Sequence, residues 1–324
     1  MRLHANEIVI TRICNAPASL VWDAWTQLEQ VGQWWGPRGF SLTTLSKDLR
    51  PGGHWNYTMH GPDGTDYPNV TKYHEVVPQE RLVYDHGGSA EREKLFTVTV
   101  TFRETKGEGT GEDGRPQTTM HMITALPTAE MAQAIMKHIR EANGTSTWDR
   151  LGEFLEARIT GKDVLLVHRS FRGPIKALFA MWTQPEMLAR WVAPSESKMT
   201  VQGKAAQEGS SSRWTMSSPD GAIAYGESRY LTVRPESLLV YLQHFSDADE
   251  RIRKPGFSAT YPDTILTTVT FTQESPVDTR VGVQWEIHDD ATEAERATFR
   301  GMKAGMNTGW NGSFDRLQAL LDSA

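Results

Sequence analysis

Hydrophobic residues recur along this chain with two different periods, and the change from one period to the other marks the predicted elements. Residues 8–13 are rich in β-branched side chains and predict a first strand. From residue 16 to residue 35 apolar residues recur at helical spacing, which predicts two short helices. Pro17 suits the first turn of a helix, where its missing N–H has no intrahelical role. Gly36-Pro37 ends the second helix.

Strand-like alternation dominates the next eighty residues, and a long helical pattern closes the first half of the chain. The predicted strands cover residues 40–45, 52–59, 70–77, 81–86, 96–102 and 118–124. On the fifth of these, alternation turns Phe96, Val98, Val100 and Phe102 toward the interior. Residues 128–155 then return to helical spacing. This order predicts an α+β domain in which a curved antiparallel sheet grips its C-terminal helix and leaves a cleft between them.

The second half of the chain repeats the first half. Three pairs share an offset of 157 residues without a gap: Trp25 with Trp182, Trp34 with Trp191, and Pro37 with Pro194. Leu82-Val83-Tyr84 recurs at the same offset as Leu239-Val240-Tyr241. Such agreement indicates an internal duplication. We therefore predict two tandem domains of the same fold, residues 1–158 and 159–324.

Several of these residues also carry a resemblance to a known family. The motifs are Val21-Trp22-Asp23-Ala24-Trp25-Thr26, Trp34-Trp35-Gly36-Pro37, Arg50 to Trp55, and Val77 to Tyr84. In this order they resemble the activator of heat-shock-protein-90 ATPase homologues, which belong to the START-like, or SRPBCC, superfamily. The resemblance covers nearly all of both halves and implies the helix-grip fold in each.

Composition narrows the class of protein. The 324 residues carry a net charge of −6, and neither half is basic, which argues against nucleic-acid binding. Cys14 is the single cysteine, so no intramolecular disulfide can form, and a buried free thiol in a reducing compartment is expected. The N-terminus is too polar for a signal peptide, and no apolar run approaches the ~20 residues of a membrane helix. We expect a soluble, cytoplasmic protein that does not bind membranes.

The sequence lacks the motifs of common catalytic and metal sites. It contains no Gly-x-Ser-x-Gly, His-Glu-x-x-His, phosphate-loop or Cys-x-x-Cys pattern, so we predict no catalytic residue, no metal and no cofactor. His54 and His60 lie on the strand face opposite Trp55 and are expected to face solvent. His74 and His86 share the strand parity of Tyr84, which makes them the best polar candidates for the cleft.

Aromatic residues are more numerous than a small core of sheet and helix requires, and they suggest the wall of an apolar pocket. Each of them, taken alone, fits a core position better than a ligand contact. The candidates in the first half are Trp25, Trp34, Trp35, Trp55, Tyr57, His74, Tyr84, His86, Phe96, Met120, Met122 and Ile135. Those in the second half are Trp182, Trp191, Trp214, Tyr230, Tyr241, Phe271, Trp285 and Met302.

We therefore predict non-catalytic binding of a small hydrophobic molecule in the cleft of each domain. Two alternatives remain open. The resemblance implies a co-chaperone-like module that binds a chaperone or another protein, or a polyketide-cyclase-like enzyme in which His74, His86 or Arg81 projects into the cleft. The two halves are expected to pack as an intramolecular pseudo-dimer. Residues 244–262 lengthen one connection of the second half and form either a lid or partner contact, or a solvated excursion.

Overall fold

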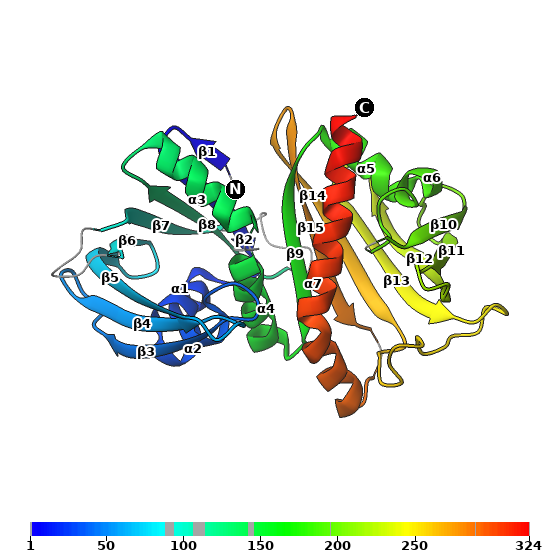
Figure 1. Ribbon diagram of the computed structural model, residues 1–324, viewed down its shortest axis with the longest axis horizontal. Helices are drawn as coiled ribbons and strands as arrows, with labels where there is room; N and C mark the ends of the chain where they lie inside the picture. Colours follow the sequence, from blue (N-terminus) through cyan, green and yellow to red (C-terminus); the bar gives the residue numbers. More distant parts are fainter. Residues whose placement is uncertain are drawn as a thin grey trace. The chain divides into compact units, whose positions relative to one another are not determined.

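Two compact units make up the chain, residues 1–161 and residues 162–324. The computed structural model describes residues 2–87, 94–105, 114–141, 146–194, 196–288 and 290–323. Each unit, called a domain below, combines one antiparallel sheet with helices that cover it (Figure 1). The predicted α+β class and the tandem helix-grip architecture are therefore confirmed.

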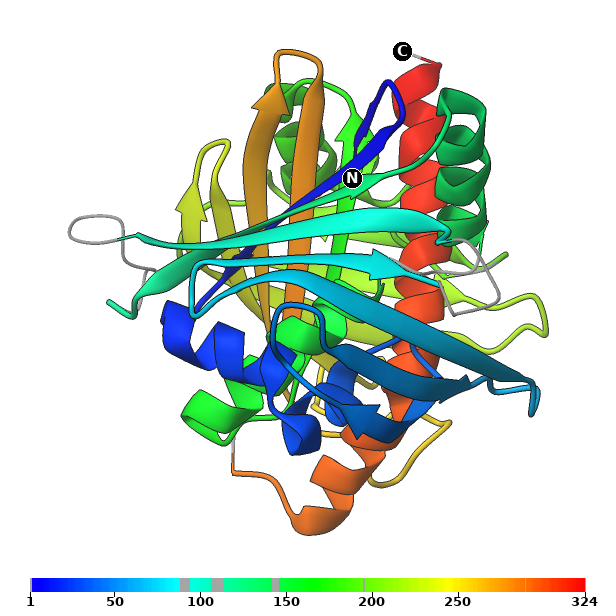
Figure 2. The same ribbon diagram turned by 90° about the vertical axis from the view of Figure 1, so that its left-hand side faces the viewer.

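The first domain contains an eight-stranded sheet. Its elements are β1 (Arg2–His4), β2 (Glu7–Cys14), α1 (Ala18–Thr26), α2 (Leu28–Trp34), β3 (Ser41–Lys47), β4 (His54–His60), β5 (Asp66–Val77), β6 (Arg81–His86), β7 (Phe96–Thr105), β8 (Gln117–Ala125), α3 (Ala129–Glu141) and α4 (Ser146–Thr160). The strand order is β1-β2-β8-β7-β6-β5-β4-β3, and Figure 2 shows these strands side by side. Only β1 was absent from the prediction, because three residues are too few for a periodic signal.

The second domain repeats this plan in a seven-stranded sheet. Its elements are β9 (Val164–Arg172), α5 (Ile175–Thr183), α6 (Pro185–Leu188), β10 (Lys198–Gly203), β11 (Ser211–Ser217), β12 (Ile223–Arg234), β13 (Leu238–Ser246), β14 (Ile265–Ser275), β15 (Asp278–Ile287) and α7 (Glu293–Asp322). The strand order is β10-β11-β12-β13-β14-β15-β9. Figure 1 shows α7 lying along one face of this sheet.

Alternation along the strands sets which side chains enter each core. Val98, Val100 and Phe102 on β7 are buried, as the pattern predicted, and so are Trp55 and Tyr57 on β4. Cys14 is buried as a free thiol, and burial raises its pKa to about 12. At neutral pH this sulfur is therefore protonated and behaves as a small apolar group.

A repeated tryptophan contact closes the first helix of each domain. The last carbonyls of a helix have no intrahelical partner. The indole Nε1 of Trp34 donates to the carbonyl oxygen of Ala24 at 2.9 Å, and Trp191 donates to the carbonyl oxygen of Met181 at 3.0 Å. Both indoles are fully buried. The same bond at an offset of 157 residues shows that the two domains share one register here.

Candidate ligand-binding site

A cavity of about 350 Å³ lies between the sheet and α7 of the second domain. Every layer of the domain contributes to its wall. The lining residues are Trp182, Leu188, Val192, Pro194, Met199, Val201, Ser212, Trp214, Met216, Ser228, Tyr230, Tyr241, Gln243, Phe245, Phe257, Tyr261, Trp285, Met302, Gly305, Met306, Gly309, Trp310 and Ser313. Most of these side chains are aromatic or aliphatic, as in ligand pockets generally.

Two substitutions between the repeats help to leave this space. At the offset of 157 residues, Trp35 corresponds to Val192 and Trp55 corresponds to Ser212. The register is shared, because Trp55 pairs across the strands with Thr71 and Ser212 pairs with Ser228 at the same offset. In the first domain the rings of Trp35 and Trp55 contact each other, with centroids 5.5 Å apart. In the second domain both corresponding positions are small and line the cavity.

Two glycines on α7 leave volume open at the helical wall of the cavity, because they have no side chain. Gly305 and Gly309 are spaced one turn apart on α7 and both line the cavity. A Cβ added to Gly305 would meet no atom within 4 Å, and one added to Gly309 would only touch Pro194 at 3.8 Å. A glycine inside a helix destabilises it by about 0.5–1 kcal/mol relative to alanine. The helix therefore carries an energetic cost at positions where a side chain would reduce the open volume.

The long connection between β13 and β14 borders the cavity. It runs from residue 247 to residue 264 and contributes Phe257 and Tyr261 to the wall. The rings of Phe245, Phe257 and Tyr261 contact one another with centroids 5.5–5.8 Å apart. Phe257 is nevertheless 61% exposed, so it lies at the rim of the cavity. The segment therefore lies at the pocket mouth, and its role as a lid or partner contact stays a prediction.

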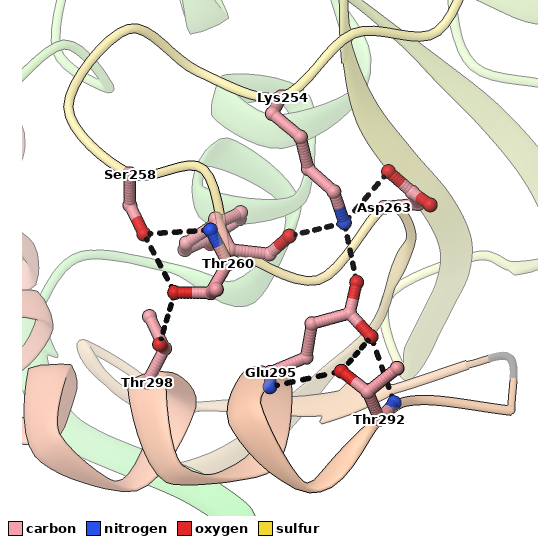
Figure 3. Close-up of polar contacts among 8 residues, drawn as sticks. Lys254, Ser258, Thr260, Asp263, Thr292, Glu295 and Thr298 are labelled. Carbon is pink, nitrogen blue, oxygen red and sulfur yellow. Dashed lines mark hydrogen bonds and ion pairs between the residues drawn. The ribbon is translucent and has the colours of Figure 1, made fainter.

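Lys254 anchors this connection to the start of α7 (Figure 3). Its Nζ donates to the carbonyl oxygen of Tyr261 at 2.6 Å, lies 2.9 Å from Oδ1 of Asp263, and forms an ion pair with Glu295. Thr260 on the same connection shares a hydroxyl hydrogen bond of 2.7 Å with Thr298 of α7. These contacts fix the connection to the helix directly beside the cavity.

Glu295 binds Lys254 of the connection and also caps the N-terminus of α7. Its carboxylate accepts the backbone N–H of Thr292 at 2.8 Å, while the Thr292 hydroxyl accepts the backbone N–H of Glu295 at 3.3 Å. This reciprocal pair is a capping box, which supplies partners for N–H groups at the helix start. The bonds from Lys254 and from Thr292 lower the pKa of Glu295 to about 2, so the carboxylate is charged throughout the physiological range.

The structure brings most of the predicted residues of the second domain to one cavity. Trp182, Trp214, Tyr230, Tyr241, Trp285 and Met302 line it. Trp191 and Phe271 lie in the surrounding core and do not border the cavity. The sequence reasoning missed the small residues Val192, Ser212, Gly305 and Gly309, because it searched for large aromatic side chains. The unequal pairs of the repeat alignment were the signal that could have found Val192 and Ser212.

In the first domain the predicted residues pack mainly against one another. Trp25, Trp34, Trp55, Tyr57, Tyr84, Met120 and Met122 are buried in one cluster, and Trp35 and Phe96 pack against it. Ile135 belongs to a separate cluster with Ile8 and Leu126. Trp25 stacks on Trp148 with ring planes 14° apart, and Trp55 stacks on Tyr57 with centroids 4.0 Å apart. A ligand-contacting role for these residues stays a prediction.

The expected orientation of His74 is wrong. Its side chain is 43% exposed, and its Nε2 lies 2.7 Å from the carboxylate of Asp85. Tyr73 pairs with Tyr84 and is buried, so alternation along β5 places His74 on the opposite face of the sheet. Arg81 is likewise half exposed and pairs with Glu75. Two of the three side chains that a cyclase-like enzyme would need in the cleft therefore lie elsewhere.

His86 lies on the inner face of the sheet, as predicted. Its ring stacks on Phe96 with centroids 4.8 Å apart, and burial lowers its pKa to about 4. An unfolded histidine has a pKa near ~6.5. Between these two values the unfolded chain binds a proton that the folded domain does not, so stability decreases as the pH falls from about 6.5 toward 4.

His86→Gln should therefore remove part of the acid sensitivity of the first domain. Gln243 occupies the corresponding position of the second domain, so the exchange follows the chain's own repeat. We expect the loss of unfolding free energy between pH 7 and pH 5 to shrink by up to about 2 kcal/mol. Urea denaturation at the two pH values measures it. His54→Gln, on the exposed face of β4, is the control, and an unchanged pH dependence of H86Q would contradict the assignment.

No helix in the described part of the chain combines the length and the apolar character that crossing a bilayer requires. Among the same residues, no group of three or more histidine, cysteine, aspartate or glutamate side chains is placed to hold a metal ion.

Comparison with known proteins places both halves in one family. Residues 15–156 and residues 172–322 each match the family model described as Activator of Hsp90 ATPase homolog 1-like protein. No curated protein matches the chain.

Solved structures of similar fold each cover about half of the chain. Protein NE0264 from Nitrosomonas europaea is 23% identical, covers 47% of this chain and is itself covered over 95% of its length, with a TM-score of 0.40. Protein Ms6760 from Mycobacterium smegmatis is 20% identical over 49% of this chain and 90% of its own, with a TM-score of 0.41. Protein CV1439 from Chromobacterium violaceum is 23% identical over 49% of this chain and 96% of its own, with a TM-score of 0.38.

Proposed function

The chain belongs to the family of Activator of Hsp90 ATPase homolog 1-like proteins, and we propose that its second domain binds a small hydrophobic ligand between the sheet and α7. The observation that carries the proposal is the cavity of about 350 Å³ with its mainly aromatic and aliphatic wall. Pockets of roughly 300–1,000 Å³ suit small molecules. An apolar cavity of about 150 Å³ already binds benzene, so a ligand of two or three rings fits here.

The proposal concerns the second domain in particular. In the first domain the rings of Trp35 and Trp55 occupy the two wall positions that Val192 and Ser212 leave open. Ligand binding by the first domain therefore stays a prediction from the sequence. We propose a cytoplasmic location, with which a single buried free thiol is compatible.

Ligand-induced stabilisation tests the proposal. The full chain is heated with a library of neutral aromatic compounds, lipids and sterols, and unfolding is followed by fluorescence of an external dye. A ligand present at 100 times its dissociation constant adds about 2.7 kcal/mol of stability. For a domain of this size that corresponds to a rise in Tm of roughly 5–10 °C. If no compound shifts the transition of the second domain, the proposal fails.

Gly305→Leu tests the location of the ligand. The new side chain starts in open space at the cavity wall, so we expect binding of any hit to weaken at least ~10-fold, about 1.4 kcal/mol. The helix should become slightly more stable, because leucine is a better helix former than glycine by up to about 0.8 kcal/mol.

Gly301→Leu is the matched control for this change. Gly301 lies one turn earlier on α7, is equally free of neighbours within 4 Å, and does not line the cavity. The G301L variant should bring the same gain in helix stability without loss of ligand affinity. Calorimetric titration measures the ligand affinity of both variants. Equal affinities for G305L and G301L would place the ligand elsewhere. A chaperone partner stays a prediction from family membership.

A further inference from the structure

The wall of the second-domain cavity is polar only through uncharged groups. Among the described residues that line it, none is an aspartate, glutamate, lysine, arginine or histidine. The polar side chains are hydroxyls, one amide and indole N–H groups. The hydroxyls belong to three serines and to Tyr230, Tyr241 and Tyr261, the amide belongs to Gln243, and the indoles belong to the four tryptophans of the wall. A ligand inside this space would therefore meet dipoles and apolar surface, and no formal charge.

Charged groups near the cavity are paired or hydrogen-bonded and do not lie on its wall. The ammonium of Lys254 lies between the carboxylates of Asp263 and Glu295, so this group keeps a net negative charge at the rim. The guanidinium of Arg316 stays charged and donates to two neutral acceptors, the carbonyl oxygen of Trp191 at 3.1 Å and the hydroxyl of Ser313 at 3.4 Å. Among the described residues of the wall itself, no charged side chain is present to pair with a charged ligand.

The phenol groups of the wall also remain uncharged. Burial raises the pKa of Tyr230 and Tyr241 above its usual value and raises the pKa of Tyr261 to about 12. Tyr230 shares a long hydroxyl contact of 3.4 Å with Ser212. At neutral pH these hydroxyls can donate to or accept from a neutral polar group of the ligand.

We infer that the second domain selects an uncharged aromatic or alicyclic ligand that carries hydroxyl or carbonyl groups, and that it rejects carboxylates and ammonium ions of the same shape. This inference rests on the proposed function and adds the chemical class of the ligand. Its physical basis is desolvation. A charged group that leaves water without finding a counter-ion loses far more solvation than it regains, whereas a carbonyl recovers a hydrogen bond from the wall.

Matched probes on one ring system test this inference with the full chain. The probes are 2-acetylnaphthalene, which is neutral, 2-naphthoic acid, which is anionic at pH 7, and 2-(aminomethyl)naphthalene, which is cationic. Affinities are measured by calorimetric titration between pH 5 and pH 7. A pKa near ~4 leaves about one molecule of 2-naphthoic acid in a thousand protonated at pH 7. If only this protonated form binds, the apparent affinity at pH 7 should be roughly 1,000-fold lower than the affinity of the protonated form itself. The apparent affinity of the acid should then rise about tenfold for each unit of pH decrease, while that of the ketone stays constant.

Gln243→Lys supplies a second, independent readout. This variant places an ammonium at the wall, and we expect 2-naphthoate to bind at least ~10-fold more tightly to it than to the unmodified chain, with the ketone little changed. Ser212→Trp should weaken the binding of every probe at least ~10-fold, and this loss would locate the binding in the cavity.

The outcomes separate the inference from the proposed function. Strong binding of the ketone together with weak, pH-dependent binding of the acid supports both. Equal affinity of ketone and acid at pH 7, lost in S212W, overturns the inference and leaves the proposed function standing. Absence of binding by all three probes and by the wider library overturns both.

Discussion

A chain in which Val192 and Ser212 are both replaced by tryptophan is expected to remain folded and to lose ligand binding by the second domain. The first domain shows that this fold accommodates the pair, because Trp35 and Trp55 lie at the corresponding positions with their rings in contact. Two indoles at the wall would occupy the space that a ligand needs. We expect affinity to fall at least ~100-fold, about 3 kcal/mol, in calorimetric titration.

The two single variants and one control variant test whether the loss of affinity comes from filling the cavity. Val192→Trp and Ser212→Trp should each weaken binding at least ~10-fold, and poor packing could cost each about 1–3 kcal/mol of stability. Arg213→Trp adds a tryptophan to the same strand on its exposed face, where Arg213 pairs with Glu250. This control should bind normally. A folded double variant with wild-type affinity would show that the ligand does not occupy the cavity.

Trp34→Ala should destabilise the first domain more than any surface substitution. Trp34 is 0% exposed, and its indole contacts Trp25, Trp35 and Trp148. Removing such a ring leaves a cavity and costs about 3–5 kcal/mol of unfolding free energy. The loss of the bond to the Ala24 carbonyl adds to this, because that oxygen lies at a helix end. Urea denaturation followed by circular dichroism should show the transition of the first domain at lower denaturant.

Three comparisons separate the causes. Trp34→Phe retains an aromatic ring and removes the hydrogen bond, so it should cost about 1–3 kcal/mol. Trp191→Ala should shift the transition of the second domain instead, since Trp191 makes the same bond there. Leu45→Ala, at a side chain that is 71% exposed, should change stability by less than about 0.5 kcal/mol. A W34A chain as stable as L45A would refute the capping role of this tryptophan.

The fold could be predicted from the sequence because its signals are periodic and occur twice. Alternation at Phe96 to Phe102 identified an inner strand face, and every strand of the first sheet except β1 was found. The tryptophans at positions 25 and 34 and their copies revealed the repeat. In both domains the later tryptophan of each pair closes a helix by a side-chain bond. Periodicity and spacing are local properties, so one sequence contains them in full.

The orientation of His74 could not be predicted in this way. The prediction carried odd and even numbering from β6 to β5, but only the register between two strands decides which of their residues share a face. Tyr73, and not His74, pairs with Tyr84. Alternation along β5 is regular here, with Thr71 and Tyr73 buried and Lys72 and His74 exposed. The register depends on the turn between the strands and on tertiary packing, so local parity alone does not give it.

The cavity was predicted only in part for a different physical reason. A cavity exists where side chains are small, whereas the sequence reasoning ranked residues by the size of their apolar groups. It therefore included Trp191, which fills the core, and omitted Gly305, which lines the open space. Comparing the two halves position by position would have located the difference at Val192 and Ser212.

The double task of Glu295 has a consequence for how a bound molecule could leave. The carboxylate that begins α7 also retains Lys254 beside the cavity rim, and it loses its charge only near pH 2. Stability from a carboxylate with a lowered pKa is fully present above the unfolded value of about 4.3 and is lost as the pH falls through the folded one. Mild acidification would therefore leave the contacts of Glu295 with Lys254 and with Thr292 intact. If the proposed ligand leaves past Phe257, protonation of Glu295 would not control its release rate at any pH above about 4.3.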